Sequence, residues 1–148
     1  MPNLRKSSLN LTLLLIAVIV LIVAGCAPAP VAAPAAVAPV SGAALPAEIS
    51  VAEAAAKRDA GAFILDVRQP DEWNAVHIPG ATLIPLDQLE ARVNEVPKDK
   101  EVVVVCRSGN RSQQGRDILK KAGFPQVTSM SGGMNQWSAA GHPTATGP

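Results

Sequence analysis

The chain has 148 residues, which suggests one folded domain with an appendage, because domains commonly hold roughly 100 to 200 residues. A formal net charge of +1 and an aromatic content of 3% argue against a nucleic-acid partner, which would need a basic surface or stacking side chains. Apolar residues make up 48% of the sequence, but many of them precede residue 46 and are not expected to join the domain core.

The N-terminus has the pattern of a bacterial export signal. Two basic residues, Arg5 and Lys6, precede an uncharged apolar stretch, and two small residues then lead directly into Cys26. The stretch is short for a membrane-spanning helix, which needs about 20 apolar residues. This order of features resembles the lipobox of bacterial lipoproteins, in which the chain is cut before a cysteine that carries a diacylglycerol. We therefore expect residues 1–25 to be a signal peptide and Cys26 to be the lipidation site.

Residues 26–47 are rich in alanine, proline and valine and are expected to form a tether. Their five prolines oppose a helix, and their side chains are too small to close a core. The tether would hold the domain, which we place at residues 48–146, on the extracytoplasmic side of a membrane. The alternative is an uncleaved signal anchor in which Cys26 is incidental.

Residues 48–146 alternate short apolar runs with segments of helical spacing. Ser50 and Glu53 form an S-x-x-E capping box, which predicts a helix that begins at Val51 and ends before Gly61. Further helices are predicted from Pro70 onward and over 87–96, 112–124 and 134–141, and strands around Ile49 and over 63–67, 81–84, 102–106 and 126–130. This alternation predicts an α/β domain with a mostly parallel central sheet and helices on both faces. The four valines of 102–105 should form the buried central strand.

Cys106 follows the four valines, at the end of the strand where parallel sheets bind ligands. The backbone N–H groups of a loop that leads into a helix can form an anion-binding nest, and the helix dipole strengthens it. Gly109 permits the left-handed backbone that such a loop needs. With Arg107 and Arg111 nearby, this setting should favour a thiolate nucleophile. If Cys26 carries lipid, Cys106 has no intrachain disulfide partner.

Several motifs occur in an order that resembles the single-domain rhodaneses, a family of sulfurtransferases. They are ILDVR (64–68), Glu72-Trp73, HIPGA (77–81), CRSGNRS (106–112), GGMNQW (132–137) and GHPT (141–144), with departures at Val76 and Gly115. The resemblance implies a rhodanese-like fold covering essentially all of the chain after the tether. It also implies that Cys106 takes the outer sulfur of a donor such as thiosulfate, becomes a persulfide and passes the sulfur to cyanide or a thiol, without a cofactor. The substrate-binding loop would comprise Arg107, Ser108, Gly109, Asn110, Arg111 and Ser112.

The spacing from Cys106 to Arg111 is C-x4-R, as in rhodaneses, whereas related phosphatases and arsenate reductases have C-x5-R. We therefore favour sulfur transfer over phosphoryl or arsenate chemistry. A membrane-tethered persulfide carrier that serves one protein partner, with little turnover of small donors, is the alternative. Asp66, Arg68 and His77 are expected to support the site structurally. No metal site is expected, because two distant histidines and a free cysteine do not form a ligand set.

Overall fold

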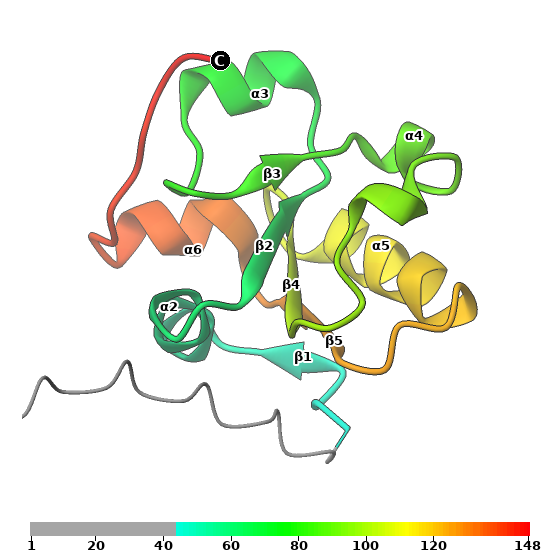
Figure 1. The fold of residues 1–148 in the computed structure, drawn as a ribbon. Coiled ribbons are helices and arrows are strands. Elements are labelled where there is room, and N and C mark those ends of the chain that lie inside the picture. The colour runs from blue at the N-terminus through cyan, green and yellow to red at the C-terminus, as the bar shows by residue number, and fades with distance from the viewer. Residues whose placement is uncertain (1–43) are drawn as a thin grey trace, which may run out of the picture. The chain divides into compact units, whose positions relative to one another are not determined.

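The computed structural model describes residues 44–148, and its core is one five-stranded sheet (Figure 1). The strands are β1 (Glu48–Ile49), β2 (Phe63–Asp66), β3 (Thr82–Leu83), β4 (Val102–Val105) and β5 (Val127–Met130). They are ordered β1-β5-β4-β2-β3, and each neighbouring pair is parallel. The predicted α/β fold is therefore confirmed, with the four-valine strand at the centre of the sheet.

Residues 44–148 contain six helical segments, of which five connect strands and the last follows β5. They are α2 (Val51–Asp59), α3 (Pro70–Ala75), α4 (Leu86–Leu89), the 3-10 helix η2 (Val93–Glu95), α5 (Asn110–Lys121) and α6 (Gly133–Ala139). Figure 1 shows α2 and α6 on one side of the sheet and α4 and α5 on the other. No helix in residues 44–148 is long and apolar enough to cross a membrane.

Side chains that alternate along the strands supply two separate cores. From β4, Val103 and Val105 join the core beneath α2 and α6, whereas Val102, Val104 and the following Cys106 join the core beneath α4 and α5. All four valines are fully buried. A parallel strand with helices on both faces needs apolar residues at successive positions, which explains the uninterrupted valine run.

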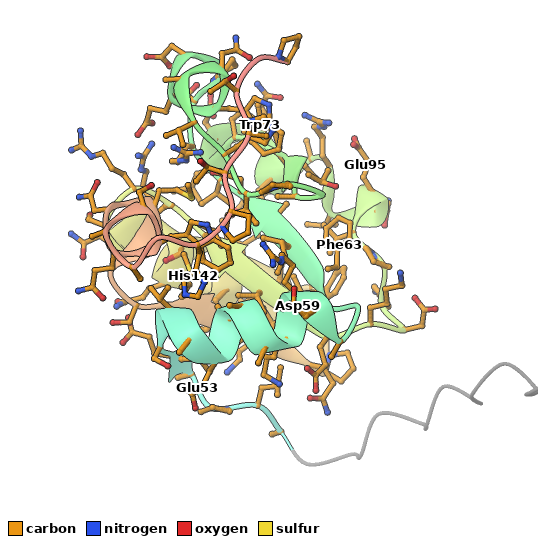
Figure 2. The ribbon with its side chains drawn as sticks, turned by 90° about the vertical axis from the view of Figure 1, so that its left-hand side faces the viewer. Glu53, Asp59, Phe63, Trp73, Glu95 and His142 are labelled. Carbon is orange, nitrogen blue, oxygen red and sulfur yellow. The ribbon has the colours of Figure 1, made fainter. Side chains whose placement is uncertain are left out.

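The predicted capping box at the start of α2 is present. The backbone N–H of Glu53 donates to the Ser50 hydroxyl over 3.3 Å, and the backbone N–H of Ser50 donates to the Glu53 carboxylate over 2.8 Å. Figure 2 shows Glu53 at this end of the helix. These bonds satisfy two amides that would otherwise lack helical partners.

The predicted helix over 87–96 is wrong in its length. The structure has one short helix that ends at Leu89 and a separate 3-10 turn from Val93 to Glu95. Both segments still direct apolar side chains to the core, because Leu89 is buried and Val93 packs against the same cluster. Apolar residues at intervals of three and four fit two successive turns as well as one continuous helix.

The predicted signal peptide over 1–25 and the lipidation site at Cys26 lie outside the residues that the structure describes. They stay predictions, as do the tether and the proposed limits of the domain.

Candidate active site

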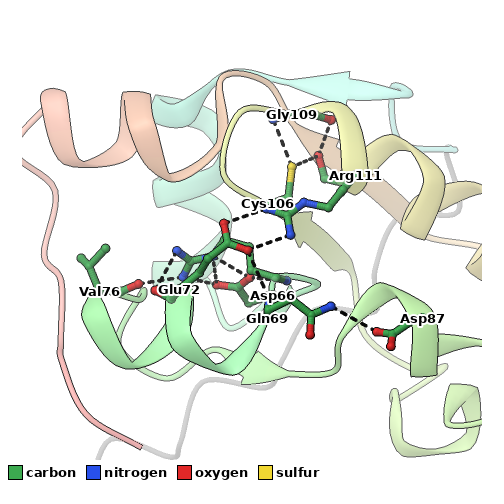
Figure 3. Close-up of polar contacts among 10 residues, drawn as sticks. Asp66, Gln69, Glu72, Val76, Asp87, Cys106, Gly109 and Arg111 are labelled. Atoms are coloured by element: carbon green, nitrogen blue, oxygen red, sulfur yellow. Dashed lines mark hydrogen bonds and ion pairs between the residues drawn. The ribbon is translucent and has the colours of Figure 1, made fainter.

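Cys106 lies at the carboxyl end of the central strand, beneath the loop that leads into α5 (Figure 3). Its residue is only 1% exposed, and the sulfur accepts a hydrogen bond from the N–H of Gly109 over 3.1 Å. The thiol donates to the hydroxyl of Ser112, 3.6 Å away, and that hydroxyl donates to the Gly109 carbonyl over 2.7 Å. Gly109 has φ of 109°, the left-handed backbone that allows its amide to face the sulfur.

The first turn of α6 holds the start of this loop from outside. The N–H of Met134 donates to the carbonyl of Cys106 over 2.8 Å, and the N–H of Asn135 donates to the carbonyl of Arg107 over 3.0 Å. In a planar trans peptide the N–H points opposite to the C=O. The amides of Arg107 and Ser108 therefore point away from α6, as required of a loop whose N–H groups face an anion.

Arg111 forms a two-pronged ion pair with Glu72 of α3. Its Nη1 and Nη2 donate to the two carboxylate oxygens over 2.8 and 2.7 Å, and the pair joins the Cys106 loop to α3 (Figure 3). These hydrogen bonds are the main reason that the pKa of Glu72 is lowered and that of Arg111 is raised. A charge interaction with Cys106 also contributes to the raised pKa of Arg111. Arg107 and Arg111 were both expected to favour the Cys106 thiolate, but Arg111 already pairs with the carboxylate of Glu72.

Asp66, the last residue of β2, and Arg68 form a buried ion pair, with exposed fractions of 1% and 2%. The guanidinium also donates to the carbonyls of Glu72 and Val76, over 3.2 and 2.7 Å. Because Glu72 lies within α3 and Val76 is the residue that ends it, the pair supports the helix that carries Glu72. This geometry is that of a structural support, and no bond joins either residue to Cys106.

His77 follows the C-cap residue of α3 and is 8% exposed. Its ring stacks on Trp73 with centroids 3.9 Å apart, and its Nδ1 is 3.0 Å from the Trp73 carbonyl oxygen. Its backbone pairs with Ala145 in the C-terminal segment. These contacts hold the chain after α3 in place and do not involve the Cys106 sulfur.

The remaining loop residues differ in exposure. Arg107, Ser108 and Asn110 are exposed, whereas Gly109 and Ser112 are buried. Arg107 borders a pocket of about 410 Å³ between α3 and α6, which is lined by Arg68, Glu72, Val76, Arg107, Met134, Asn135 and Ser138. Through Arg107 this pocket lies beside the Cys106 loop. The described residues contain no group of three or more His, Cys, Asp or Glu side chains placed to hold a metal ion.

The Rhodanese-like domain family matches residues 50–140, more than half of the chain. The chain belongs to this family. A rhodanese-related protein from Thermoplasma volcanium aligns with a TM-score of 0.62 at 28% identity, over 66% of this chain and 96% of that structure. The rhodanese-like domain of an Anabaena protein aligns with a TM-score of 0.63 at 27% identity, over 69% of this chain and 80% of that structure.

Three curated relatives of this rhodanese-like chain are named for sulfur transfer or sulfur carriage. "Sulfurtransferase" of Allochromatium vinosum is 38% identical over 81 residues, which cover 55% of this chain and 76% of the relative. "Thiosulfate sulfurtransferase GlpE" of Pseudomonas fluorescens is 39% identical over 85 residues, 57% of this chain and 78% of the relative. YrkF of Bacillus subtilis, named as a sulfur carrier protein, is 41% identical over 75 residues, 51% of this chain but only 40% of the relative.

Two features of the rhodanese-like site were not predicted from the sequence. Glu72 was noted only as part of a motif, and its pairing with Arg111, 39 positions away, had no local signal beyond an acidic residue in the first turn of a helix. The close approach of the Gly133 backbone to the carbonyl of Cys106 was also missed. In the sequence, this approach was indicated only by the two glycines, Gly132 and Gly133, before the predicted helix over 134–141.

Proposed function

We propose that this chain is a sulfurtransferase in which Cys106 carries the transferred sulfur as a persulfide. The observation that carries the proposal is the placement of the Cys106 sulfur under a C-x4-R loop, with the Gly109 amide donating to it over 3.1 Å. An amide aimed at a sulfur stabilises negative charge there, which both a thiolate and a persulfide bear. The family and the names of the relatives support the same chemistry.

The reaction has two steps. The Cys106 thiolate attacks the outer sulfur of a donor such as thiosulfate, a new S–S bond forms, and the donor S–S bond breaks so that sulfite leaves with the electron pair. A thiolate or cyanide acceptor then attacks the outer sulfur of the persulfide and regenerates the Cys106 thiolate. Once the thiol has lost its proton, the Ser112 hydroxyl at 3.6 Å can donate to the sulfur by giving up its hydrogen bond to the Gly109 carbonyl.

Amides of α6 hold the Cys106 loop in its orientation, and an arginine provides positive charge for the donor. The α6 amides that bind the carbonyls of Cys106 and Arg107 fix the loop before any substrate arrives, so that little reorganisation is needed during the reaction. Arg107 is exposed at the neighbouring pocket and has no carboxylate partner among the ion pairs of residues 44–148. It is therefore the guanidinium best placed to attract an anionic donor.

The first prediction concerns Cys106. Incubation with a sulfane-sulfur donor should increase the intact mass of the chain by one sulfur atom, and Cys106→Ser should gain none. Ser112→Ala, which keeps the nucleophile but removes the hydroxyl, should still gain the sulfur. A mass increase that survives in Cys106→Ser would place the sulfur elsewhere and overturn the proposal.

The name of the YrkF relative favours one second candidate, a persulfide carrier that serves a protein partner. The two functions differ in turnover. A sulfurtransferase should release thiocyanate repeatedly when thiosulfate and cyanide are both present, whereas a carrier should form the Cys106 persulfide once and then hold it. Thiocyanate formed per mole of chain distinguishes them.

A further inference from the structure

The end of the chain connects the two helices that border the pocket beside the Cys106 loop. Residues 142–147, which we call the C-terminal strap, leave the end of α6 and run to α3 (Figure 1). Trp137 of α6 is fully buried, and its indole N–H donates to the Pro143 carbonyl over 2.9 Å. Its ring also lies 4.7 Å from the His142 ring, measured between centroids. The first half of the strap is therefore attached to the core through α6.

The second half of the strap is attached to α3 by three backbone hydrogen bonds. His77 and Ala145 exchange two of them, each 2.9 Å long, and the Gly147 N–H donates to the Asn74 carbonyl over 2.9 Å. His77 is itself joined to α3, because its ring stacks on Trp73 and its Nδ1 lies 3.0 Å from the Trp73 carbonyl oxygen. The strap therefore holds the C-terminal end of α3.

Both attachment points are next to residues that line the pocket. His77 follows Val76, which lines the pocket where α3 ends, and Trp137 precedes Ser138, which lines it from α6. Within residues 44–148 no hydrogen bond or ion pair joins α3 directly to α6. The strap is thus the hydrogen-bonded connection between these two walls of the pocket.

The other contacts of α3 do not fix its distance from α6. The helix has no buried residue, so apolar packing contributes little to its position. Arg68, which donates to two carbonyls of this helix and its C-cap, follows β2, and Arg111, which pairs with Glu72, belongs to α5. These contacts attach α3 to the sheet and to the Cys106 loop. Its separation from α6 depends on the strap.

The α3 end of the strap can open without unfolding the domain. No residue of the strap belongs to either core, and Pro143, Thr144 and Thr146 are exposed. Segments with few buried contacts open locally at a free energy well below that of global unfolding. The three backbone hydrogen bonds can therefore break while both cores remain intact.

We propose that the C-terminal strap limits the size of the molecules that reach the Cys106 sulfur, because it holds α3 close to α6. Cys106 is only 1% exposed, so a reactant must approach it through a neighbouring space, and the pocket borders the Cys106 loop at Arg107. When the α3 end of the strap detaches, α3 can move away from α6 and the pocket admits a larger molecule. This limit applies to any reagent that attacks the sulfur, whether or not Cys106 transfers sulfur.

Alkylation of Cys106 in the full chain measures this access. Iodoacetamide and its larger N-phenyl derivative share one reacting group: the thiolate attacks the CH₂ carbon, a C–S bond forms, and iodide leaves with the electron pair. The rate constant with each reagent is obtained by mass spectrometry of the peptide that contains Cys106. The ratio of the rate for the larger reagent to that for the smaller one is then compared between variants.

Ala145→Pro removes the N–H that donates to the His77 carbonyl. It should raise the ratio about fivefold, because the loss of one backbone hydrogen bond of about 1 kcal/mol increases the detached population by about that factor. Deletion of residues 145–148 removes all three bonds to α3 and should raise the ratio further.

Two matched controls keep these bonds. Thr146→Pro is the same substitution one residue later, at an amide that donates no hydrogen bond within residues 44–148. Deletion of Pro148 alone removes a residue beyond the last bond of the strap. Both variants should keep the ratio of the unaltered chain.

An unchanged ratio in Ala145→Pro and in the deletion of residues 145–148 would overturn the proposal. Equal acceleration of both reagents would overturn it as well, because the strap would then act on the loop around the sulfur and not on the width of the pocket. A cooperative urea transition confirms that each variant is folded, and if the deletion is not, Ala145→Pro decides. Since no sulfur donor is used, failure of the proposed sulfurtransferase function would leave this result valid.

Discussion

At Gly133 the backbone of α6 comes closer to the Cys106 loop than a side chain would allow. A Cβ at this position would lie 2.3 Å from the Cys106 carbonyl oxygen and 2.6 Å from the Arg107 carbonyl carbon, and φ is +55°. Gly133→Ala should therefore lower the free energy of unfolding by about 3 kcal/mol, from crowding together with backbone strain. Urea unfolding measures this loss, and slower persulfide formation on Cys106 should accompany it.

Gly141 provides the matched control for this substitution. Its φ is also positive, +74°, but a Cβ there would have no heavy atom within 4 Å. Gly141→Ala should cost only the backbone strain, about 1 kcal/mol. Equal losses in the two variants would show that the close approach to the loop is not what requires glycine at position 133.

Among the elements, α5 shows why a helix can need a glycine in its middle. Gly115 is buried in α5, and a Cβ there would lie 3.0 Å from Val104 Cγ1 and 3.2 Å from Val67 Cγ1. Alanine would improve helix propensity by about 1 kcal/mol, but crowding in a filled core costs about 1–3 kcal/mol. Because both valines are fully buried, crowding should prevail. Gly115→Ala is expected to lower the free energy of unfolding by about 1 kcal/mol.

The control is Gln114→Ala on the exposed neighbouring position, where only propensity changes. It should alter the free energy of unfolding by no more than about 0.5 kcal/mol in the same urea experiment. If Gly115→Ala instead stabilises the domain, the side chains around it have room to move, and the close approach of α5 to the sheet is not essential.

Elements that are determined by residues close together in the sequence could be predicted from it. The capping box of Ser50 and Glu53 and the four-valine strand each depend on adjacent residues, and both are present. The predicted helix over 87–96 was too long, because its apolar spacing does not distinguish one helix from two turns. Within the candidate site, the loop at Cys106 and the positive φ of Gly109 followed from local sequence, whereas contacts between distant segments did not.

At the scale of the whole molecule, polar contacts attach α3 to the rest of the domain. The helix contributes no buried residue to either core. The Glu72 carbonyl accepts a hydrogen bond from Arg68, and the Glu72 carboxylate binds Arg111 in the first turn of α5. Electrostatic pairing, more than hydrophobic packing, therefore keeps this side of the candidate site in place, and this attachment should respond to pH.

The expected response follows from the lowered pKa of Glu72, whose main cause is the hydrogen bonding from Arg111. Between the native pKa and the ordinary value of 4.5, the unfolded chain binds more protons than the native chain, so stability rises with pH there. The contribution of the pair is complete above 4.5 and is lost as pH falls through the lower native pKa. Glu72→Gln should cost about 1 kcal/mol at neutral pH and give a shallower decline of stability in acid.

Urea unfolding at a series of pH values from neutral to below 4.5 measures this decline. Arg111→Gln should flatten it to the same extent, because without the guanidinium the main cause of the lowered Glu72 pKa is gone. The double variant should then flatten it no further, since both changes remove the same interaction. A decline that remains steep in Arg111→Gln would mean that the acid sensitivity arises elsewhere in the domain, and that the pair contributes little to holding α3 against the loop.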